Sequence, residues 1–326
     1  MQNENGCSTK ISVRQMQALM ILWIFSVAMV GIPYVVNDIT SLLLGAVFAV
    51  IEYVLICYAS KKLMNNKTLE KIAGGFAGIS VLIYSGILIR IMCGAVNIFL
   101  LPETPVFAIT LAIVFVAFYS AVLGLQSIGR AGEILFAVTA VITIMSFIFS
   151  AVDTSRSAID FFKDFEIFGD DLISNAVKAM FMFGTPSMIL VLLPHTCGMN
   201  REMSAVKACM ISVAAVVIFV IIAIFKFGYT DINVRIFPTL NIMDTVNLPF
   251  VFGDKKDIFM IRMWLFAVFS AVCSGLFVCG RAFSPGKDTS KICLIICAGL
   301  VFAISFFLPN VLFSFGKKND MAKTRP

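Results

Sequence analysis

Two short motifs that combine glycine and proline are the features of this sequence most able to form a binding site. Gly31-Ile32-Pro33 and Gly184-Thr185-Pro186 each lie inside a long apolar run. Proline removes an intrahelical hydrogen bond and glycine weakens a helix, so each motif predicts a break at mid-depth of a helix. At membrane depth, freed backbone groups must face protein or a polar cavity. A simple proline kink is the alternative explanation for either motif alone.

The positions of the two motifs favour a functional role. They fall in the first helix of each half of a ten-helix pattern, and a repeat of five helices forces the two halves into opposite orientations. Paired breaks in corresponding helices indicate the site of an inverted-repeat transporter, where half-helix ends offer N–H groups to an anionic group such as an amino-acid carboxylate. The predicted ligand-binding residues are Val30, Gly31, Ile32, Pro33, Phe183, Gly184, Thr185 and Pro186.

Four further polar residues lie inside apolar runs, where polar side chains are costly and usually functional. Glu52 is in the second run and Arg90 in the third, so they are predicted either to form an intramembrane charge pair or to leave Arg90 to act on a substrate or gate. Ser270 and Ser274 are one helical turn apart, a spacing that presents two hydroxyls to an ion or to a neighbouring helix.

His195 follows Pro194 at the end of the sixth run and is the single histidine of the chain. The ordinary pKa of histidine suits a proton carrier, and a structural role at the membrane interface is the alternative. No phosphate-binding loop, metal-ligand spacing or nucleophile motif is evident, so we expect no catalytic residue, no metal and no cofactor.

The composition is that of a membrane protein. Of 326 residues 60% are hydrophobic and 13% are charged, and the mean hydropathy is +0.98. A typical soluble domain is about half apolar and about a quarter charged, so a water-soluble fold is excluded. The net charge of +6 does not indicate a nucleic-acid binder, because the basic residues are distributed over short loops and form no stripe.

The apolar runs predict an all-α protein with nine transmembrane helices in a single domain. Each run has roughly the 20 residues that a bilayer span needs, and none shows the alternation of a barrel strand. The predicted spans are 17–36, 39–59, 75–101, 105–125, 134–152, 176–194, 205–227, 258–279 and 292–308. Lys and Arg collect in the loops that are cytoplasmic when the N-terminus is cytoplasmic, as the positive-inside rule requires. The basic tail 311–326 then falls on the opposite side, which indicates either that a tenth span is missing or that the tail is not representative of the topology.

Several segments resemble the spore germination permease family, the B subunit of bacterial germinant receptors, within the amino acid-polyamine-organocation superfamily. Residues 237–249, FPTLNIMDTVNLP, are similar to the YPTLE…TV stretch that precedes the eighth helix of that family. Residues 124–136, GLQSIGRAGEILF, resemble its entry to the fifth helix. Weaker similarities are Ile11-Ser12-Val13-Arg14-Gln15 before the first span and Leu192-Leu193-Pro194 at the end of the sixth.

The resemblance implies a LeuT-like bundle of five-plus-five inverted repeats in the inner membrane of the bacterial spore. It also implies two protein partners, a larger A subunit and a lipoprotein C subunit, and a small-molecule germinant, commonly an amino acid. A secondary amino-acid transporter of the same superfamily is the alternative function, because the same fold and site would serve both. A membrane scaffold with a vestigial site is a third hypothesis.

Overall fold

The structure is a computed structural model of the chain, and it describes residues 10–35, 39–63, 67–152, 172–234, 256–284 and 290–307. Almost all of them are helical. The elements are β1 (Ile11–Ser12), α1 (Val13–Val35), α2 (Ile39–Leu63), α3 (Lys67–Phe99), α4 (Val106–Leu123), α5 (Leu125–Val152), α7 (Leu172–Met182), α8 (Met188–Leu192), the 3-10 helix η1 (Leu193–His195), β2 (Thr196–Cys197), α9 (Arg201–Val234), α10 (Lys256–Ala282) and α11 (Lys291–Phe307).

The described helices form a transmembrane bundle. Six of them, α2, α3, α4, α5, α9 and α10, are long and apolar enough to cross a bilayer, and α1, α7 and α11 hold shorter apolar stretches. Helices satisfy their own backbone hydrogen bonds, which a lipid environment demands. Each of the nine predicted spans coincides with one or more of these helices, while residues 153–171, the motif 237–249 and the tail 311–326 lie outside the described residues.

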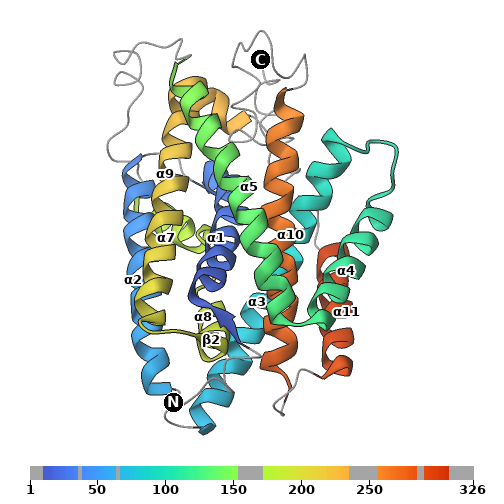
Figure 1. Cartoon of the computed structure of the whole chain (residues 1–326). Coiled ribbons are helices and arrows are strands. Elements are labelled where there is room, and N and C mark those ends of the chain that lie inside the picture. The colour runs from blue at the N-terminus through green and yellow to red at the C-terminus, as the bar shows by residue number, and fades with distance from the viewer. Residues whose placement is uncertain are drawn as a thin grey trace.

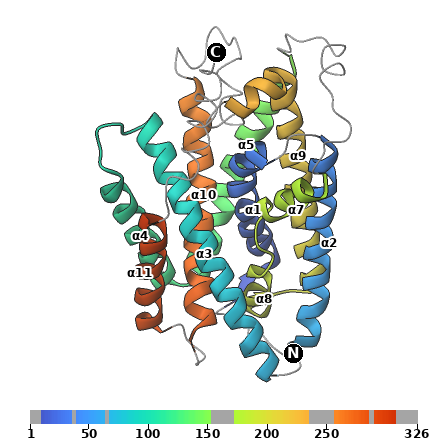
Figure 2. The ribbon, with the colours of Figure 1, turned by 180° about the vertical axis from the view of Figure 1, so that it is seen from behind.

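Helix α1 lies at the centre of the bundle. It packs against α9, α10, α5 and α7, and both views place it inside the ring of longer helices (Figures 1 and 2). Helices α4 and α11 pack on each other at one edge, where many of their large apolar side chains are exposed, as expected of a lipid-facing surface. The helix that carries the first sequence motif is therefore the central one among the described helices.

A small parallel sheet joins the start of α1 to the end of the sixth span. Ile11 pairs with Thr196 and Ser12 with Cys197. Ser12 is also the N-terminal cap of α1, because its Oγ accepts the Gln15 N–H at 3.2 Å while the Gln15 side chain accepts the Ser12 N–H at 3.0 Å. This reciprocal capping box satisfies two backbone donors at the helix start. We call this side of the bundle the β1–β2 end.

The boundary between the fourth and fifth spans differs from the prediction. We expected a loop between residues 125 and 134, but the chain turns at Gly124, whose φ is +92°, and α5 begins at Leu125. Within α5, Gly129 and Gly132 are points of close packing, since a Cβ on Gly129 would lie 3.1 Å from Ile11 and one on Gly132 would meet Leu19.

Candidate functional site

The predicted break in the sixth span is present. Helix α7 ends at Met182, residues 183–187 are unwound, and α8 begins at Met188. Gly184 has a φ of +93°, a conformation that glycine adopts without the steric cost that a side chain would add. Pro186 lies in the unwound segment, where its missing N–H breaks no helical bond. The second motif therefore specifies the local backbone as its composition predicted.

The predicted break in the first span is wrong. Helix α1 continues through Gly31, Ile32 and Pro33 to Val35, and Val30 is helical too. The physical reason is position: α1 begins at Val13, four residues earlier than predicted, so the motif lies in its last turns and not at mid-depth. Pro33 still lacks the N–H of one i→i−4 hydrogen bond, but only two helical residues follow it, so no second half-helix lies beyond the motif.

The structure nevertheless brings the two motifs together. A Cβ on Gly31 would collide with the side chain of Met182, the last residue of α7. On the other side of α7, a Cβ on Gly45 of α2 would lie 2.6 Å from the Cβ of Ala179. Glycine thus permits close approach on both sides of the half-helix that precedes the break. Helices α1, α7 and α2 are thereby fixed relative to one another.

Two tyrosine hydroxyls satisfy carbonyl groups that the break releases. Tyr84 of α3 donates to the Met182 carbonyl oxygen, and Tyr53 of α2 donates to the Phe183 carbonyl oxygen, both at 3.5 Å. Tyr53 and Phe183 are fully buried. These carbonyls would lie at the end of α7 without a helical partner, and water is absent at such depth. The break is therefore held open by side chains from two other helices.

A group of uncharged polar side chains lies around Gly184, and several of their polar atoms have no hydrogen-bond partner among the described residues. Trp23 Nε1, on α1, lies 3.2 Å from the position of a Cβ on Gly184, and Tyr84 Oη lies 3.4 Å from it. Trp23 and Tyr84 pack ring on ring with centroids 5.3 Å apart. The side-chain polar atoms of Trp23, Thr185 and Ser187 are buried and have no partner among the described residues. Buried orphan donors are rare in folded proteins and indicate a site for a bound group.

The same group extends to α10. A Cβ on Gly275 would collide with Ser85 Oγ of α3 and lie 3.0 Å from the Trp23 ring. Ser85 Oγ is likewise buried without a partner. We call Trp23, Tyr84, Ser85, Thr185 and the backbone of Gly184 the central polar cluster. It offers N–H and hydroxyl groups and no carboxylate, cation or paired nucleophile and base, so it is suited to binding and not to covalent chemistry.

The predicted pair of Glu52 and Arg90 is not formed. No ion pair joins these two residues in the described part of the chain. Helix α2 packs mainly on α7 and α9, whereas α3 packs mainly on α10 and α11. Helices α2 and α3 are consecutive in sequence but are not close neighbours in this bundle. The adjacency of the second and third spans therefore misled the prediction.

Ser270 and Ser274 have different environments although they are one turn apart. Ser274 is fully buried and donates to the carbonyl oxygens of Ser270 and Ala271 of its own helix, both at 2.9 Å. The Ser270 hydroxyl is buried and has no partner. Only Ser270 is free to bind another group, and the ion site proposed for the pair stays a prediction. No group of three or more potential metal-ligating side chains occurs among the described residues.

His195 belongs to the β1–β2 end and not to the central polar cluster. Arg281, in the last turn of α10, donates from Nε to His195 Nε2 at 3.0 Å, and His195 Nδ1 lies 2.9 Å from the Val191 carbonyl oxygen. This pattern assigns a neutral imidazole with its proton on Nδ1. His195 directly precedes β2, so the hydrogen bond ties α10 to the strand pair that closes this end (Figure 1).

Several residues of the site were not foreseen from the sequence. These residues lie in uninterrupted apolar runs, and only the fold reveals that they meet. They are Trp23, Tyr53, Tyr84, Ser85 and Gly275. One signal was available, since Trp23 is one of two tryptophans and lies in the middle of a span. Tryptophan prefers the membrane interface, so one at the centre indicates a polar partner inside the bundle.

The fold is that of LeuT-like transporters. A Na⁺-coupled sialic acid symporter in its substrate-bound outward-open state superposes with a TM-score of 0.67 at 12% identity, over 95% of this chain and 76% of that one. Mhp1, a nucleobase-cation-symport-1 family transporter in a closed conformation, gives 0.66 at 14% identity, over 97% and 77%. The overall fold is thus shared with these two structures.

Within that class, residues 10–313 match the family described as Spore germination protein. Spore germination protein YndE of Bacillus subtilis (strain 168) is 25% identical in an alignment of 291 residues that covers 81% of this chain and 77% of the relative. Spore germination protein B2 of the same organism is 25% identical over 240 residues, 68% of this chain and 63% of the relative. The chain belongs to the spore germination protein family, as its motifs indicated.

Replacing Tyr53 or Tyr84 with phenylalanine tests the support of the break. Each variant leaves a carbonyl of the unwound segment without its donor, and we expect each to lower the free energy of unfolding by about 1 kcal/mol. The measurement is thermal unfolding of the purified protein in detergent. Tyr119→Phe is the control, because Tyr119 is exposed on the outer face of α4. Equal stability of all three variants would contradict the assigned role.

The His195–Arg281 hydrogen bond predicts a pH-dependent stability. Burial lowers the pKa of His195 below its ordinary value of 6.5 and is the largest cause. The hydrogen bond with the Val191 carbonyl raises this pKa. The positive charges of Arg281 and Lys10 lower it, and the negative charge of Glu70 raises it. A depressed histidine pKa stabilises the folded arrangement above pH 6.5, and this contribution is lost as the pH falls through the lowered value.

The measurement is the unfolding temperature between pH 8 and pH 5 for the wild type and His195→Gln. The unfolding temperature of the wild type should fall below about pH 6.5. Because His195 is the only histidine of the chain, this step in the unfolding temperature should be absent from the glutamine variant. Arg281→Gln should reduce the step, since it removes the nearest cation. A step of the same size in wild type and His195→Gln would assign the titration to another group.

Proposed function

We propose that this protein is the membrane subunit of a spore germinant receptor that recognises a small nutrient germinant, an amino acid by the chemistry of its site, and triggers germination. The observation that carries the proposal is the unwound segment 183–187, lined by polar groups that have no protein partner. Membership of the spore germination protein family and the two spore germination relatives support the biological setting.

The central polar cluster fits a zwitterionic or polar ligand. The amides of Thr185 and Ser187 form no backbone hydrogen bond among the described residues, so they are available to a carboxylate. Trp23 Nε1 and the nearby hydroxyls add donors on the opposite side, and the Trp23 and Tyr84 rings offer faces to an ammonium group or an apolar side chain. Charge complementarity here rests on dipoles, because no ionised group belongs to the cluster.

Signalling follows from the position of the site between α1, α3, α10 and the α7–α8 junction. A ligand that binds one arrangement of these elements more tightly than another shifts the population by its differential affinity. In our proposal the shift is transmitted to a larger A subunit and a lipoprotein C subunit in the spore inner membrane, with the N-terminus and the β1–β2 end on the cytoplasmic side.

A secondary amino-acid transporter is the second candidate, and one observation favours it: the two solved structures compared above are transporters. Binding and translocation use the same site in such a bundle, so they differ in whether the β1–β2 end opens while ligand is bound. Here that end is held by the β1–β2 pairing and by the His195–Arg281 hydrogen bond.

An in-frame deletion of the gene separates the two functions. Germination of the deletion spores is measured against a panel of L-amino acids and sugars, and vegetative uptake of the same compounds is measured in parallel. The receptor proposal expects loss of one germinant response with unchanged uptake. Normal germination with reduced uptake of one amino acid would establish the transporter, and no change in either would exclude both.

Gly184→Leu tests the site itself. Its φ of +93° strains any side chain by about 1–3 kcal/mol, and the new Cβ would lie 3.2 Å from Trp23 Nε1, so the ligand response should be abolished while membrane insertion is retained. Gly299→Leu is a matched control, because Gly299 of α11 is exposed and has open space around it. Normal sensitivity of Gly184→Leu, with the control also normal, would remove the site from this segment.

A further inference from the structure

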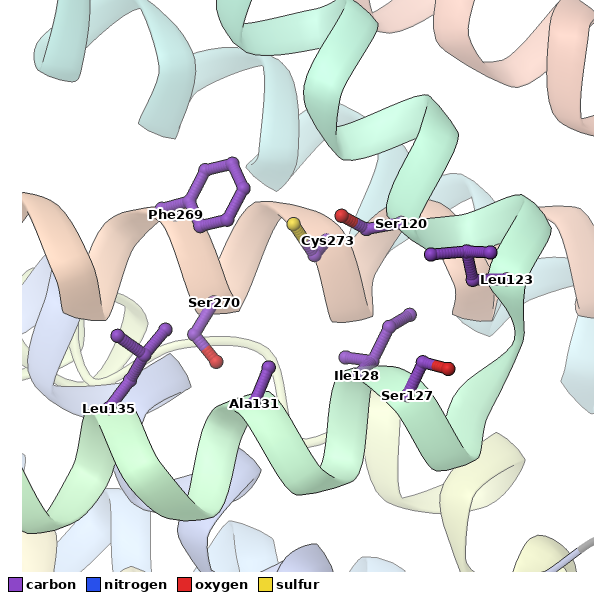
Figure 3. Close-up of a pocket in the computed structure, with 9 residues that line it drawn as sticks. All are labelled: Ser120, Leu123, Ser127, Ile128, Ala131, Leu135, Phe269, Ser270 and Cys273. Atoms are coloured by element: carbon purple, nitrogen blue, oxygen red, sulfur yellow. The ribbon is translucent and has the colours of Figure 1, made fainter.

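A second cavity lies away from the central polar cluster, between α4, α5 and α10. Its volume is about 130 Å³. Figure 3 shows the side chains that surround it, which are Ser120 and Leu123 of α4, Ser127, Ile128, Ala131 and Leu135 of α5, and Phe269, Ser270 and Cys273 of α10. None of these residues belongs to the site described above.

Ser270 is the one lining hydroxyl that is both buried and unsatisfied. It is 3% exposed, its Oγ has no hydrogen-bond partner, and it points from α10 toward α5 (Figure 3). The Ser120 hydroxyl, by contrast, is satisfied, because it donates to the Val116 carbonyl oxygen at 2.9 Å. A buried hydroxyl that faces open space is a binding point for a group that supplies its missing partner.

The rest of the lining restricts what that group is. The cavity contains no charged side chain, so an ion or a zwitterion would lose its hydration without compensation. Leu135, Phe269 and Ile128 offer apolar surface on two sides. An apolar cavity of about 150 Å³ holds one benzene molecule, which sets the size of the occupant. Ala131, Ser127 and Leu123 are exposed, so the entrance faces the outside of the bundle near the α4–α5 turn.

We propose that this cavity binds a small uncharged alcohol or phenol that enters from the membrane. The hydroxyl of the ligand hydrogen-bonds with Ser270 Oγ, and its hydrocarbon part contacts Phe269, Leu135 and Ile128. This site is independent of the proposed germinant site and carries no covalent step. The cavity lies beside Gly132, where an added Cβ would collide with Leu19 of α1 and lie 3.4 Å from Ser270 Oγ, so a bound molecule contacts α5 and α10 next to their packing on α1.

The experiment uses the full chain in lipid nanodiscs and compares phenol with benzene. The readout is the rate at which methyl methanethiosulfonate modifies Cys273, measured by mass spectrometry of the peptide that contains it. Cys279 is an internal control, since it is buried on the same helix and does not line the cavity. We expect both compounds to slow Cys273 modification without affecting Cys279, with phenol effective at a roughly fivefold lower concentration because it gains one hydrogen bond.

Two variants identify the contact. Ser270→Ala should abolish the preference for phenol while benzene still protects, and Ala131→Leu, which narrows the entrance, should weaken both compounds. Ser305→Ala is the matched control, because Ser305 of α11 is also buried with an unpartnered hydroxyl but lies outside the cavity. Equal protection by phenol and benzene in the wild type, or equal effects on Cys273 and Cys279, would overturn the proposal.

If Cys273 proves unreactive, binding of phenol at the cavity is measured instead by the line broadening of 4-fluorophenol in ¹⁹F NMR. Broadening by the wild type and by Ser305→Ala, with loss in Ala131→Leu and reduction in Ser270→Ala, would support the site. The same broadening in all four proteins would assign it to partitioning into the lipid and would refute the proposal.

Discussion

Within a lipid bilayer, the carbonyl and amide groups that a broken helix releases must find partners inside the protein. This constraint organises the bundle around residues 183–187. Tyr53 and Tyr84 donate to the two carbonyls at the end of α7, and their helices, α2 and α3, are thereby placed on either side of the break. The groups that remain unpaired, on Trp23, Ser85, Thr185 and Ser187, define where a ligand would complete the hydrogen bonding.

Close approach by glycine makes this arrangement sterically possible. Gly31 lies against Met182, Gly45 against Ala179, and Gly275 against Ser85 and Trp23. Without a hydrophobic driving force between helices in lipid, small residues at contacts allow the van der Waals packing that holds a bundle together. A larger residue at Gly31, Gly45 or Gly275 would disrupt these contacts around the break. The β1–β2 end adds a separate closure, which is formed by backbone pairing and by His195.

Sequence reasoning was accurate where a signal is local. Apolar runs located the helices, the family was recognised from short motifs, and Gly184-Thr185-Pro186 predicted its own break, because proline and glycine act on the adjacent backbone. It failed where position or long-range packing decides. The motif at residues 31–33 stays helical because it lies near a helix end, and Glu52 and Arg90 belong to helices with different neighbours. Tyr53 and Tyr84 could not be assigned, since nothing local marks residues that meet only in the folded bundle.

The central claim is that a small ligand binds beside Trp23 at the unwound segment. The most direct measurement is tryptophan fluorescence of the Trp264→Phe variant, in which Trp23 is the only tryptophan of the chain, during titration with a panel of L-amino acids. A saturable change in Trp23 emission with one amino acid, absent in Trp264→Phe combined with Gly184→Leu, is the result this account predicts. Saturable binding of that amino acid, measured independently with a radiolabel, without any change in Trp23 emission would contradict it.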